Sequence, residues 1–334
     1  MSVTESAGGA DAASGAGDLT PLVALVGPTA SGKSALALEL ARRGRLGPVT
    51  ILSCDSMQVY RGLDIGTAKP SAEERAAVPH RLLDLDTLPL AGATWQGIDA
   101  GVWARAADSV LAEERAAGRL PLVVGGTGLW LRALLWGLAE VPSVPPEVRA
   151  RITAALAAEG LPALHARLRE VDPELGARLP PRDTQRILRA LEVYEAHGTP
   201  LSQLQQRHGF ATLRYRPLIL ALDIPRPTLA ARIDARVDAM LAAGLVAEVR
   251  RLLEAGVDPD CRPLQAPGYR DVVAHLQGSL DAAAMRAAIQ LAHRRYAKRQ
   301  LTWLRGMEGV TWVAPDASDI ETRVAHFLGV EVSR

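Results

Sequence analysis

Short apolar runs alternate with stretches of helical periodicity over the first 142 residues of the chain. The runs have the length of strands, and the segments between them repeat apolar residues every three or four positions, as a helix with one buried face does. Strands that alternate with helices favour an α/β fold with a mostly parallel sheet flanked by helices. The predicted strands are residues 22–26, 49–55, 80–85 and 120–124, and the predicted helices are residues 34–41, 96–117 and a segment from 129.

A different pattern begins after the proline-rich segment 141–146. Residues 143–212 show only helical periodicity, and an apolar run at 218–223 then resumes the sheet. We therefore predict an all-helical insertion domain over 143–212, within an α/β core with C-terminal helices formed by 21–142 and 213–334. Residues 1–20 are rich in Gly, Ala and Ser without a basic residue, and we predict that they form a disordered tail.

The composition is that of a globular protein, with 48% apolar and 22% charged residues in 334. The tail lacks the apolar stretch of a secretory signal, and no apolar run approaches the roughly 20 residues that span a bilayer. The two cysteines, Cys54 and Cys261, lack a metal-binding spacing. Cys54 could be a reactive thiol, but we favour a small buried strand residue. These features predict a cytoplasmic protein without a membrane partner, and we expect a monomer.

A phosphate-binding loop follows the first predicted strand. The segment Gly27-Pro28-Thr29-Ala30-Ser31-Gly32-Lys33-Ser34 fits the pattern G-x-x-x-x-G-K-[ST]. In such a loop backbone N–H groups surround phosphates, the lysine reaches the outer ones, and the last hydroxyl meets a magnesium ion. A strand before the loop and a helix after it are the context that the motif requires. We predict that this loop binds a phosphate-rich group, with Ser34 as the metal ligand; a chance glycine-rich turn is the alternative.

The acid expected of an ordinary P-loop NTPase is missing from its place. The predicted strand 120–124 ends in Gly125-Gly126-Thr127, whereas the strand 49–55 ends in Asp55. Loops at the carboxyl ends of parallel strands converge on the ligand in an open α/β sheet. We therefore expect Lys33, Asp55 and Thr127 to face one crevice. Considered alone, Asp55 could be a helix cap and Thr127 a strand-end residue that satisfies a turn.

The predicted helix 228–243 carries two like-charged pairs at a spacing of four residues. Arg232 and Arg236 form one pair, and Asp234 and Asp238 form the other. Like charges at this spacing destabilise an isolated helix by a few tenths of a kcal/mol. An anion that faces the arginines would reverse the penalty; partners on a neighbouring helix are the alternative.

The segment 286–305 is strongly basic although the net charge of the chain is only +1. It can follow a phosphate backbone, or it can be a solvated helix face. Tyr296 and Trp303 within it suit stacking on bases or sugars, although Trp303 could equally be core. Its cations are Arg286, Arg294, Arg295, Lys298, Arg299 and Arg305, and it contains no acid.

Together these segments resemble the bacterial tRNA dimethylallyltransferases, also called tRNA isopentenyltransferases. The similarity extends from about Val23 to Trp312. Besides the loop and Asp55, its blocks are Gly66-Thr67-Ala68-Lys69-Pro70, His80-Arg81-Leu82-Leu83-Asp84, Gly125-Gly126-Thr127, Gln185-Arg186, Gly268-Tyr269-Arg270 and the run from Lys298 to Arg305. The chain has only three lysines against 35 arginines, and all three lie in these blocks, which favours roles at phosphates.

The resemblance implies a P-loop NTPase-like core that binds the pyrophosphate of dimethylallyl diphosphate where other members bind nucleotide phosphates. It implies transfer of the dimethylallyl group to N6 of the adenosine 3′-adjacent to the anticodon of tRNA, position 37, with release of pyrophosphate. Lys33, Arg236 and Mg²⁺ held by Ser34 would stabilise the departing pyrophosphate. Asp55 would accept the N6 proton. Thr127 would orient either N6 or a donor phosphate oxygen.

The resemblance also implies a tRNA surface. It comprises Asp55, Ser56, Met57, Gln58, Thr127, Arg149, Gln185, Arg186, Arg189, Gly268, Tyr269, Arg270, Lys298, Arg299 and Arg305. RNA proteins read splayed bases through their edges, a task for which Gln58 is well suited. One departure is Trp130, where the family usually has Tyr, so any hydrogen bond made by that phenol is in doubt.

Three other functions compete with this interpretation. An adenylate isopentenyltransferase would share the loop and Asp55 without needing the insertion or the basic helix. A small-molecule P-loop kinase would consume ATP without a prenyl donor. A non-catalytic RNA-binding module would retain the loop as a relic, which the presence of Lys33, Ser34 and Thr127 together with Asp55 argues against.

Overall fold

The computed structural model describes residues 19–209 and 212–331. The chain forms two compact units, one comprising the residues up to Leu135 and from Arg214 onward, the other running from Trp136 to Leu213. The predicted insertion 143–212 falls inside the second unit, and its boundaries stay a prediction. The predicted tail lies outside the described residues except for Leu19 and Thr20.

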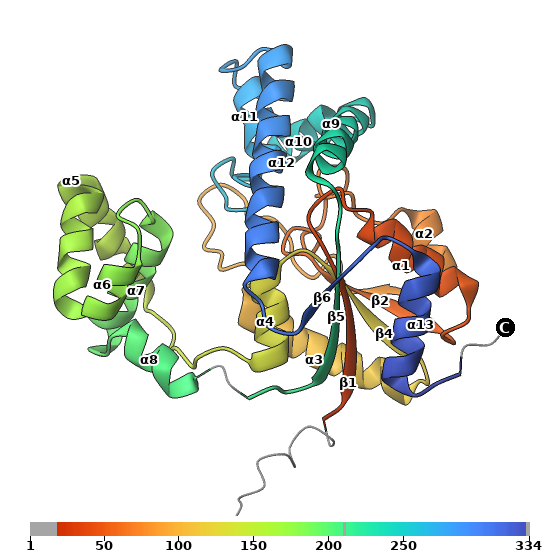
Figure 1. Ribbon diagram of the computed structural model, residues 1–334. Helices are drawn as coiled ribbons and strands as arrows, with labels where there is room; N and C mark the ends of the chain where they lie inside the picture. Colours follow the sequence, from red (N-terminus) through yellow and green to blue (C-terminus); the bar gives the residue numbers. More distant parts are fainter. Residues whose placement is uncertain (1–18, 210–211, 332–334) are drawn as a thin grey trace, which may run out of the picture. The chain divides into compact units, whose positions relative to one another are not determined.

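The first unit is built on a parallel sheet whose six described strands have the order β3-β2-β4-β1-β5-β6 (Figure 1). The central strands are buried along most of their length, which explains their uninterrupted apolar sequence. The predicted α/β class with a parallel sheet is confirmed. The strands are β1 Pro21–Val26, β2 Val49–Cys54, β3 His80–Arg81, β4 Leu120–Gly125, β5 Arg216–Leu222 and β6 Val310–Val313.

Helices flank this sheet. α1 and α13 pack on it in one cluster, in which Leu36 and Leu40 meet Ile320 and Val324. Trp103 of α3 stacks on Trp130 of α4 with ring centroids 5.1 Å apart. Trp130, which stands where the resembled family usually has Tyr, is therefore a buried packing residue. The helices of this unit are α1 Lys33–Arg43, α2 Ala72–Ala77, α3 Ala100–Ala116, α4 Gly128–Trp136, α9 Arg226–Ala242, α10 Leu245–Glu254, α11 Tyr269–Leu276, α12 Ala282–Arg305 and α13 Ala317–Leu328.

The third predicted strand is much shorter than expected. The prediction covered residues 80–85, but β3 contains only His80 and Arg81. Leu82 and Asp84 have φ angles of 65° and 55°, in the left-handed region that a strand cannot contain. The chain turns there because Asp84 is held by Lys69 and Arg75. The apolar run therefore marked a partly buried turn after a short edge strand.

The second unit is helical throughout its named elements. α5 Pro146–Val171 is broken at Gly160, whose φ of 80° and ψ of 163° are not helical. Its core brings Ile152, Leu164 and Leu168 of α5 against Ile187 and Leu191 of α7. The other helices are α6 Pro173–Arg178, α7 Thr184–His197 and α8 Leu201–His208.

Candidate active site

The predicted phosphate loop connects β1 to α1. Ala30 and Gly32 both adopt left-handed φ angles, 63° and 91°, which turn the chain sharply into the helix. Within the part of the chain that the structure describes, the N-terminus of α1 has no side-chain cap and no acid in its first turn. Its N–H groups and the positive end of its dipole are therefore available to an anion, as in other phosphate-binding helices.

Cations surround this loop. Lys33, at the first position of α1, donates to the Pro28 carbonyl at 3.3 Å. The pKa of its ammonium is lowered to about 8, first by burial and then by the Arg236 guanidinium, with the Asp55 carboxylate opposing both effects. Burial also lowers the pKa of Arg236. Arg232 donates to the Ser31 carbonyl at 3.3 Å.

Two polar atoms beside this loop are buried without a hydrogen-bond partner among the described residues. They are the hydroxyl oxygen of Ser31 and Nε of Arg236. The guanidinium of Arg236 otherwise reaches only the Thr67 carbonyl, at a long 3.5 Å. Buried polar atoms in native proteins almost always have partners. An anion between α1 and α9 would supply an acceptor for Arg236 at this point.

The two like-charged pairs of α9 have different partners. Asp238 accepts two hydrogen bonds from Arg286 of α12, at 2.6 and 2.8 Å, and Asp234 is paired with Arg294 at 2.8 Å. The arginines of α9 instead face the phosphate loop. The neighbouring-helix explanation therefore holds for the aspartates, and the arginines keep the geometry expected of an anion site.

Asp55 and Thr127 follow adjacent strands, and the structure brings them together. β2 and β4 pair with Cys54 opposite Gly125, and the Thr127 N–H donates to the Cys54 carbonyl at 3.2 Å. The Thr127 hydroxyl accepts from the Ser56 N–H at 3.0 Å. Asp55 accepts from the Met57 N–H at 2.9 Å through one carboxylate oxygen, so it also serves the turn. Both residues thus lie at neighbouring strand ends and support their own loops.

Tyr296 of α12 lies at this site, although the sequence indicated only a stacking role for it. Its phenol lies beside the Thr127 side chain. Burial and the nearby Asp55 raise the pKa of this phenol. The Arg299 guanidinium lies 5.6 Å from its ring centroid. The helical spacing of the basic segment separates an inward face from the cationic face. This spacing was the signal that could have placed Tyr296 at the site.

Cys54 is a buried strand residue, as favoured. Its thiol is 1% exposed and lies 3.7 Å from the Thr127 carbonyl. Burial, and then the Asp55 carboxylate, raise the pKa of the thiol, which keeps it protonated. Reactive cysteines have lowered pKa values and some exposure. The structure therefore offers no basis for a nucleophilic role.

The residues expected to contact tRNA in this unit divide into exposed and buried ones. Lys298, Arg299, Arg305 and Arg270 are exposed. Tyr269 is only 2% exposed and donates to Glu248 at 2.8 Å, so the prediction that its side chain contacts tRNA is corrected: it packs against Gly66. Gly268, beside it, is buried as well.

Gln58 is engaged at both ends of its amide. Its carbonyl oxygen accepts from the Ser53 hydroxyl at 2.8 Å, and its nitrogen donates to the Thr67 and Ala68 carbonyls at 3.2 and 3.3 Å. Ser56 and Met57, next to it, are partly buried. In this arrangement Gln58 braces the following loop, and reading a base edge would require it to exchange these partners.

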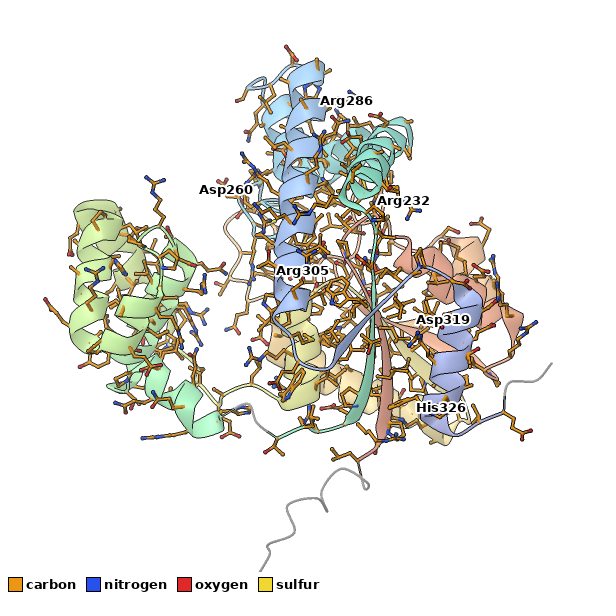
Figure 2. All side chains as sticks on the ribbon, in the orientation of Figure 1. Arg232, Asp260, Arg286, Arg305, Asp319 and His326 are labelled. Carbon is orange, nitrogen blue, oxygen red and sulfur yellow. The ribbon has the colours of Figure 1, made fainter. Side chains whose placement is uncertain are left out.

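The basic face of α12 is smaller than its sequence indicates. Arg286 and Arg305 lie toward opposite ends of the helix (Figure 2). Arg286 and Arg294 are paired with aspartates of α9, which offsets their charge. The remaining cations of the basic segment 286–305 are Arg295, Lys298, Arg299 and Arg305. Trp303 is partly buried and packs against Gly128 at the start of α4.

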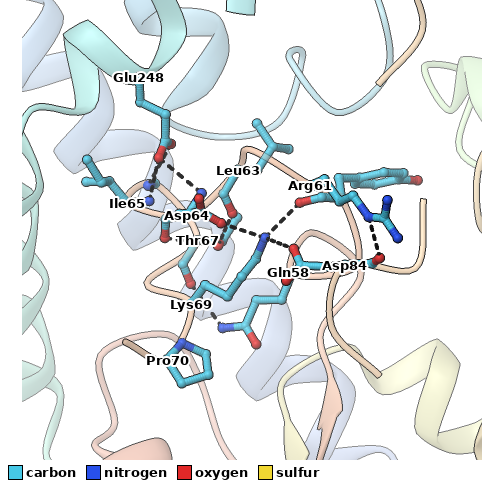
Figure 3. A network of polar contacts seen from close by, with 12 residues as sticks. Gln58, Arg61, Leu63, Asp64, Ile65, Thr67, Lys69, Pro70, Asp84 and Glu248 are labelled. Atoms are coloured by element: carbon cyan, nitrogen blue, oxygen red, sulfur yellow. Dashed lines mark hydrogen bonds and ion pairs between the residues drawn. The ribbon is translucent and has the colours of Figure 1, made fainter. Parts of the chain in front are cut away.

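Lys69 belongs to a buried network of polar contacts (Figure 3). Its ammonium, with a side chain 1% exposed, lies 2.7 Å from carboxylate oxygens of both Asp64 and Asp84, and 2.8 Å from the Tyr60 carbonyl. It therefore holds a loop, and the inference that all three lysines serve phosphates is wrong for this one.

Glu248 of α10 completes the network from the other side. This 2% exposed carboxylate accepts from the backbone N–H groups of Asp64, Ile65 and Gly66 at 2.7 to 3.3 Å. It also accepts from the Tyr269 hydroxyl. The loop that carries Thr67, the partner of Arg236, is thereby fixed.

The remaining predicted contacts lie in the second unit. Gln185 and Arg186 are exposed on α7, and Arg186 pairs with Asp183, its N-cap. Arg189 lies 3.6 Å from Glu192. Arg149 is exposed on α5. Their roles in tRNA binding stay predictions.

The described residues contain neither a membrane-spanning helix nor a cluster of metal ligands. None of the helices in 19–209 and 212–331 combines the length and apolarity needed to cross a membrane. Over the same residues no group of three or more His, Cys, Asp or Glu side chains could hold a metal ion. The exposed Ser34 hydroxyl, in the first turn of α1, remains the predicted protein ligand.

Comparisons with known proteins agree with the geometry. The chain matches the family model described as IPP transferase over residues 58–307 and that described as isopentenyl transferase over residues 20–88. It is 51% identical over 296 residues to the tRNA dimethylallyltransferase of Anaeromyxobacter dehalogenans (strain 2CP-C), covering 88% of this chain and 95% of that protein.

Solved structures show the same similarity. The full-length tRNA isopentenylpyrophosphate transferase of Bacillus halodurans has 34% sequence identity and a TM-score of 0.65, over 92% of this chain and 97% of that one. A eukaryotic dimethylallyltransferase acting on tRNA has a TM-score of 0.74 over 94% of this chain and 81% of that one. Its 23% identity makes it evidence for the fold alone.

Proposed function

The chain belongs to the tRNA dimethylallyltransferase family, and from that premise we propose that it transfers the dimethylallyl group of dimethylallyl diphosphate to N6 of adenosine 37 in tRNA, releasing pyrophosphate. The observation that carries the proposal is the meeting of two sets of residues at the carboxyl ends of β1, β2 and β4. Lys33 and Arg236 supply positive charge there, and Asp55 and Thr127 supply polar groups for an amine.

The donor side stabilises a leaving group. Pyrophosphate gathers negative charge as the bond from its oxygen to the allylic carbon breaks. The N–H groups at the N-terminus of α1, Lys33 and Arg236 would bind this charge, and charge stabilisation of this kind is usually the largest catalytic contribution. The unpartnered Nε of Arg236 supports the assignment, because the diphosphate supplies the acceptor that the described residues lack.

A magnesium ion fits the oxygen ligands available here. Mg²⁺ commonly keeps several waters and binds one or two protein groups together with substrate phosphates. The Ser34 hydroxyl would be its protein ligand, and the ion would neutralise part of the diphosphate charge. No dedicated cluster of acids is needed for this mode of binding.

The acceptor side must assist a poor nucleophile. The N6 lone pair of adenine is delocalised into the ring, and the amine becomes cationic as the new C–N bond forms. Asp55 would accept the N6 proton, which is the task of a general base. The Thr127 hydroxyl, which accepts from the Ser56 N–H, would orient the amine or a phosphate oxygen.

Product analysis tests this proposal. The protein is incubated with dimethylallyl diphosphate and Mg²⁺ and either tRNA or AMP, and the nucleosides are examined by mass spectrometry. We expect dimethylallyl adenosine only from tRNA, and none with Lys33→Ala. Prenylated AMP would instead indicate the free-nucleotide enzyme, and ATP hydrolysis without a prenyl donor would indicate a kinase.

A further inference from the structure

Gln300 of α12 joins the two loops that, on the proposed function, hold the two substrates. Its side-chain oxygen Oε1 accepts from the Thr29 backbone N–H at 2.8 Å. Its nitrogen Nε2 donates to the Gly126 carbonyl at 3.0 Å. Thr29 belongs to the phosphate loop, and Gly126 directly precedes Thr127. A single carboxamide therefore connects the donor loop to the acceptor loop.

The neighbours of this carboxamide allow it one orientation. A backbone N–H can only donate and a carbonyl can only accept, so Oε1 must face Thr29 and Nε2 must face Gly126. Gln300 is 6% exposed, which restricts water from replacing either bond. A Cβ at residue 126 would lie 2.2 Å from Nε2, so the contact also requires glycine there.

The position of Gln300 on α12 separates it from the basic face. Lys298 and Arg299, its neighbours in sequence, are exposed. Tyr296, one helical turn earlier, lies on the inward side with Gln300, beside the Thr127 side chain. Although Gln300 lies inside a segment expected to bind tRNA, its side chain contacts the loops beneath the helix.

We propose that Gln300 is a positioning residue that fixes the phosphate loop relative to the Gly126–Thr127 turn. It thereby fixes the reacting carbon of the donor relative to the acceptor amine. Neither substrate has to touch it. Reacting atoms must be held about 3–3.5 Å apart with aligned orbitals, and misplacement by about 1 Å can cost roughly 10²-fold in rate. Loosening the two loops should therefore lower kcat while each substrate still binds its own loop.

Truncation of this side chain tests the proposal. We expect Gln300→Ala to lower kcat about 10²-fold, with the Kd values of donor and tRNA changing less than about threefold. Gln290→Ala is the matched control, because Gln290 lies in the same helix and is equally buried at 7%, away from both loops. Weaker tRNA binding with unchanged kcat would make Gln300 a surface contact and overturn the proposal, as would wild-type turnover.

Gln300→Glu keeps the shape of the side chain and replaces the hydrogen-bond donor Nε2 with an oxygen of a titratable carboxyl group. The ionised carboxylate still accepts from Thr29 but opposes the Gly126 carbonyl, whereas the protonated acid restores both bonds. The ratio of variant to wild-type kcat should rise as the pH falls from about 8 to about 5, since burial raises the pKa of a carboxyl. Taking the ratio cancels the pH dependence of every group that both proteins share.

A ratio that does not change with pH would refute the positioning role, even if the variant were less stable. The wild-type reaction in the same assay separates this result from failure of the proposed function. If wild-type protein forms no prenylated tRNA, the function is wrong. If it does and Gln300→Glu matches it at every pH, the positioning role is wrong.

Discussion

The lowered pKa of Lys33 predicts how donor affinity depends on pH. With a pKa of about 8 in the free protein, the ammonium is about nine-tenths protonated at pH 7 and about one-tenth protonated at pH 9. A bound diphosphate favours the charged form, so Lys33 stays protonated in the complex. The donor association constant should therefore fall about tenfold from pH 7 to pH 9, in proportion to the protonated fraction.

Calorimetry with a non-reactive diphosphate analogue measures this effect. At pH 8 about half of the free protein must take up a proton on binding, so the apparent enthalpy in two buffers should differ by about half of their difference in ionisation enthalpy. The phosphates of the ligand are already ionised above about pH 7 and add little to the change.

Lys33→Arg is the control for this prediction. A guanidinium keeps its proton over the whole range, so the pH dependence should disappear even though the forked group binds the loop less well. Constant wild-type affinity between pH 7 and pH 9 would refute the reasoning. An equal fall in Lys33→Arg would assign the titration to another group.

Three further variants test other parts of the molecule. Asp55→Ala should lower kcat roughly 10²–10⁴-fold with little change in KM, and rescue by raised magnesium would make Asp55 a metal ligand and contradict its role as base. Arg295→Glu and Arg299→Glu should weaken tRNA binding and reduce the salt slope by at most about one unit per phosphate contact, whereas Arg294→Gln, which loses only an aspartate pair, should leave the slope unchanged. Glu248→Gln should destabilise the fold by about 1–3 kcal/mol in denaturant unfolding, because an amide cannot accept as many bonds from the 64–66 loop; unchanged unfolding would show that the carboxylate is dispensable there.

The parts of the site that sequence predicted are those that follow from local pattern and sheet topology. Lys33 lies in a contiguous motif, and Asp55 and Thr127 follow buried parallel strands whose ends must converge. The charge pattern of residues 228–243 favoured an anion beside Arg232 and Arg236, with partners on a neighbouring helix as the alternative.

The parts that sequence did not predict depend on packing between distant elements. Arg286 and Arg294 appear basic in sequence, but aspartates 48 and 60 residues earlier neutralise them. Lys69 and Tyr269 both lie in sequence blocks that carry the family resemblance. Both are nevertheless buried in the network around Glu248 and the 64–70 loop. Which face of a helix a partner covers is set by tertiary structure, and no local pattern encodes it.

The cations at the phosphate loop also bear on the end of the catalytic cycle. In the proposed reaction Lys33, Arg236 and the first turn of α1 bind only the diphosphate, and that part of the donor survives as the released product. Free pyrophosphate carries the charge that the ester bond had masked, so the same groups bind it at least as firmly as they bind the donor. The groups that bind the donor tightly thus also slow the dissociation of pyrophosphate. We expect the prenylated tRNA and pyrophosphate to dissociate at different rates.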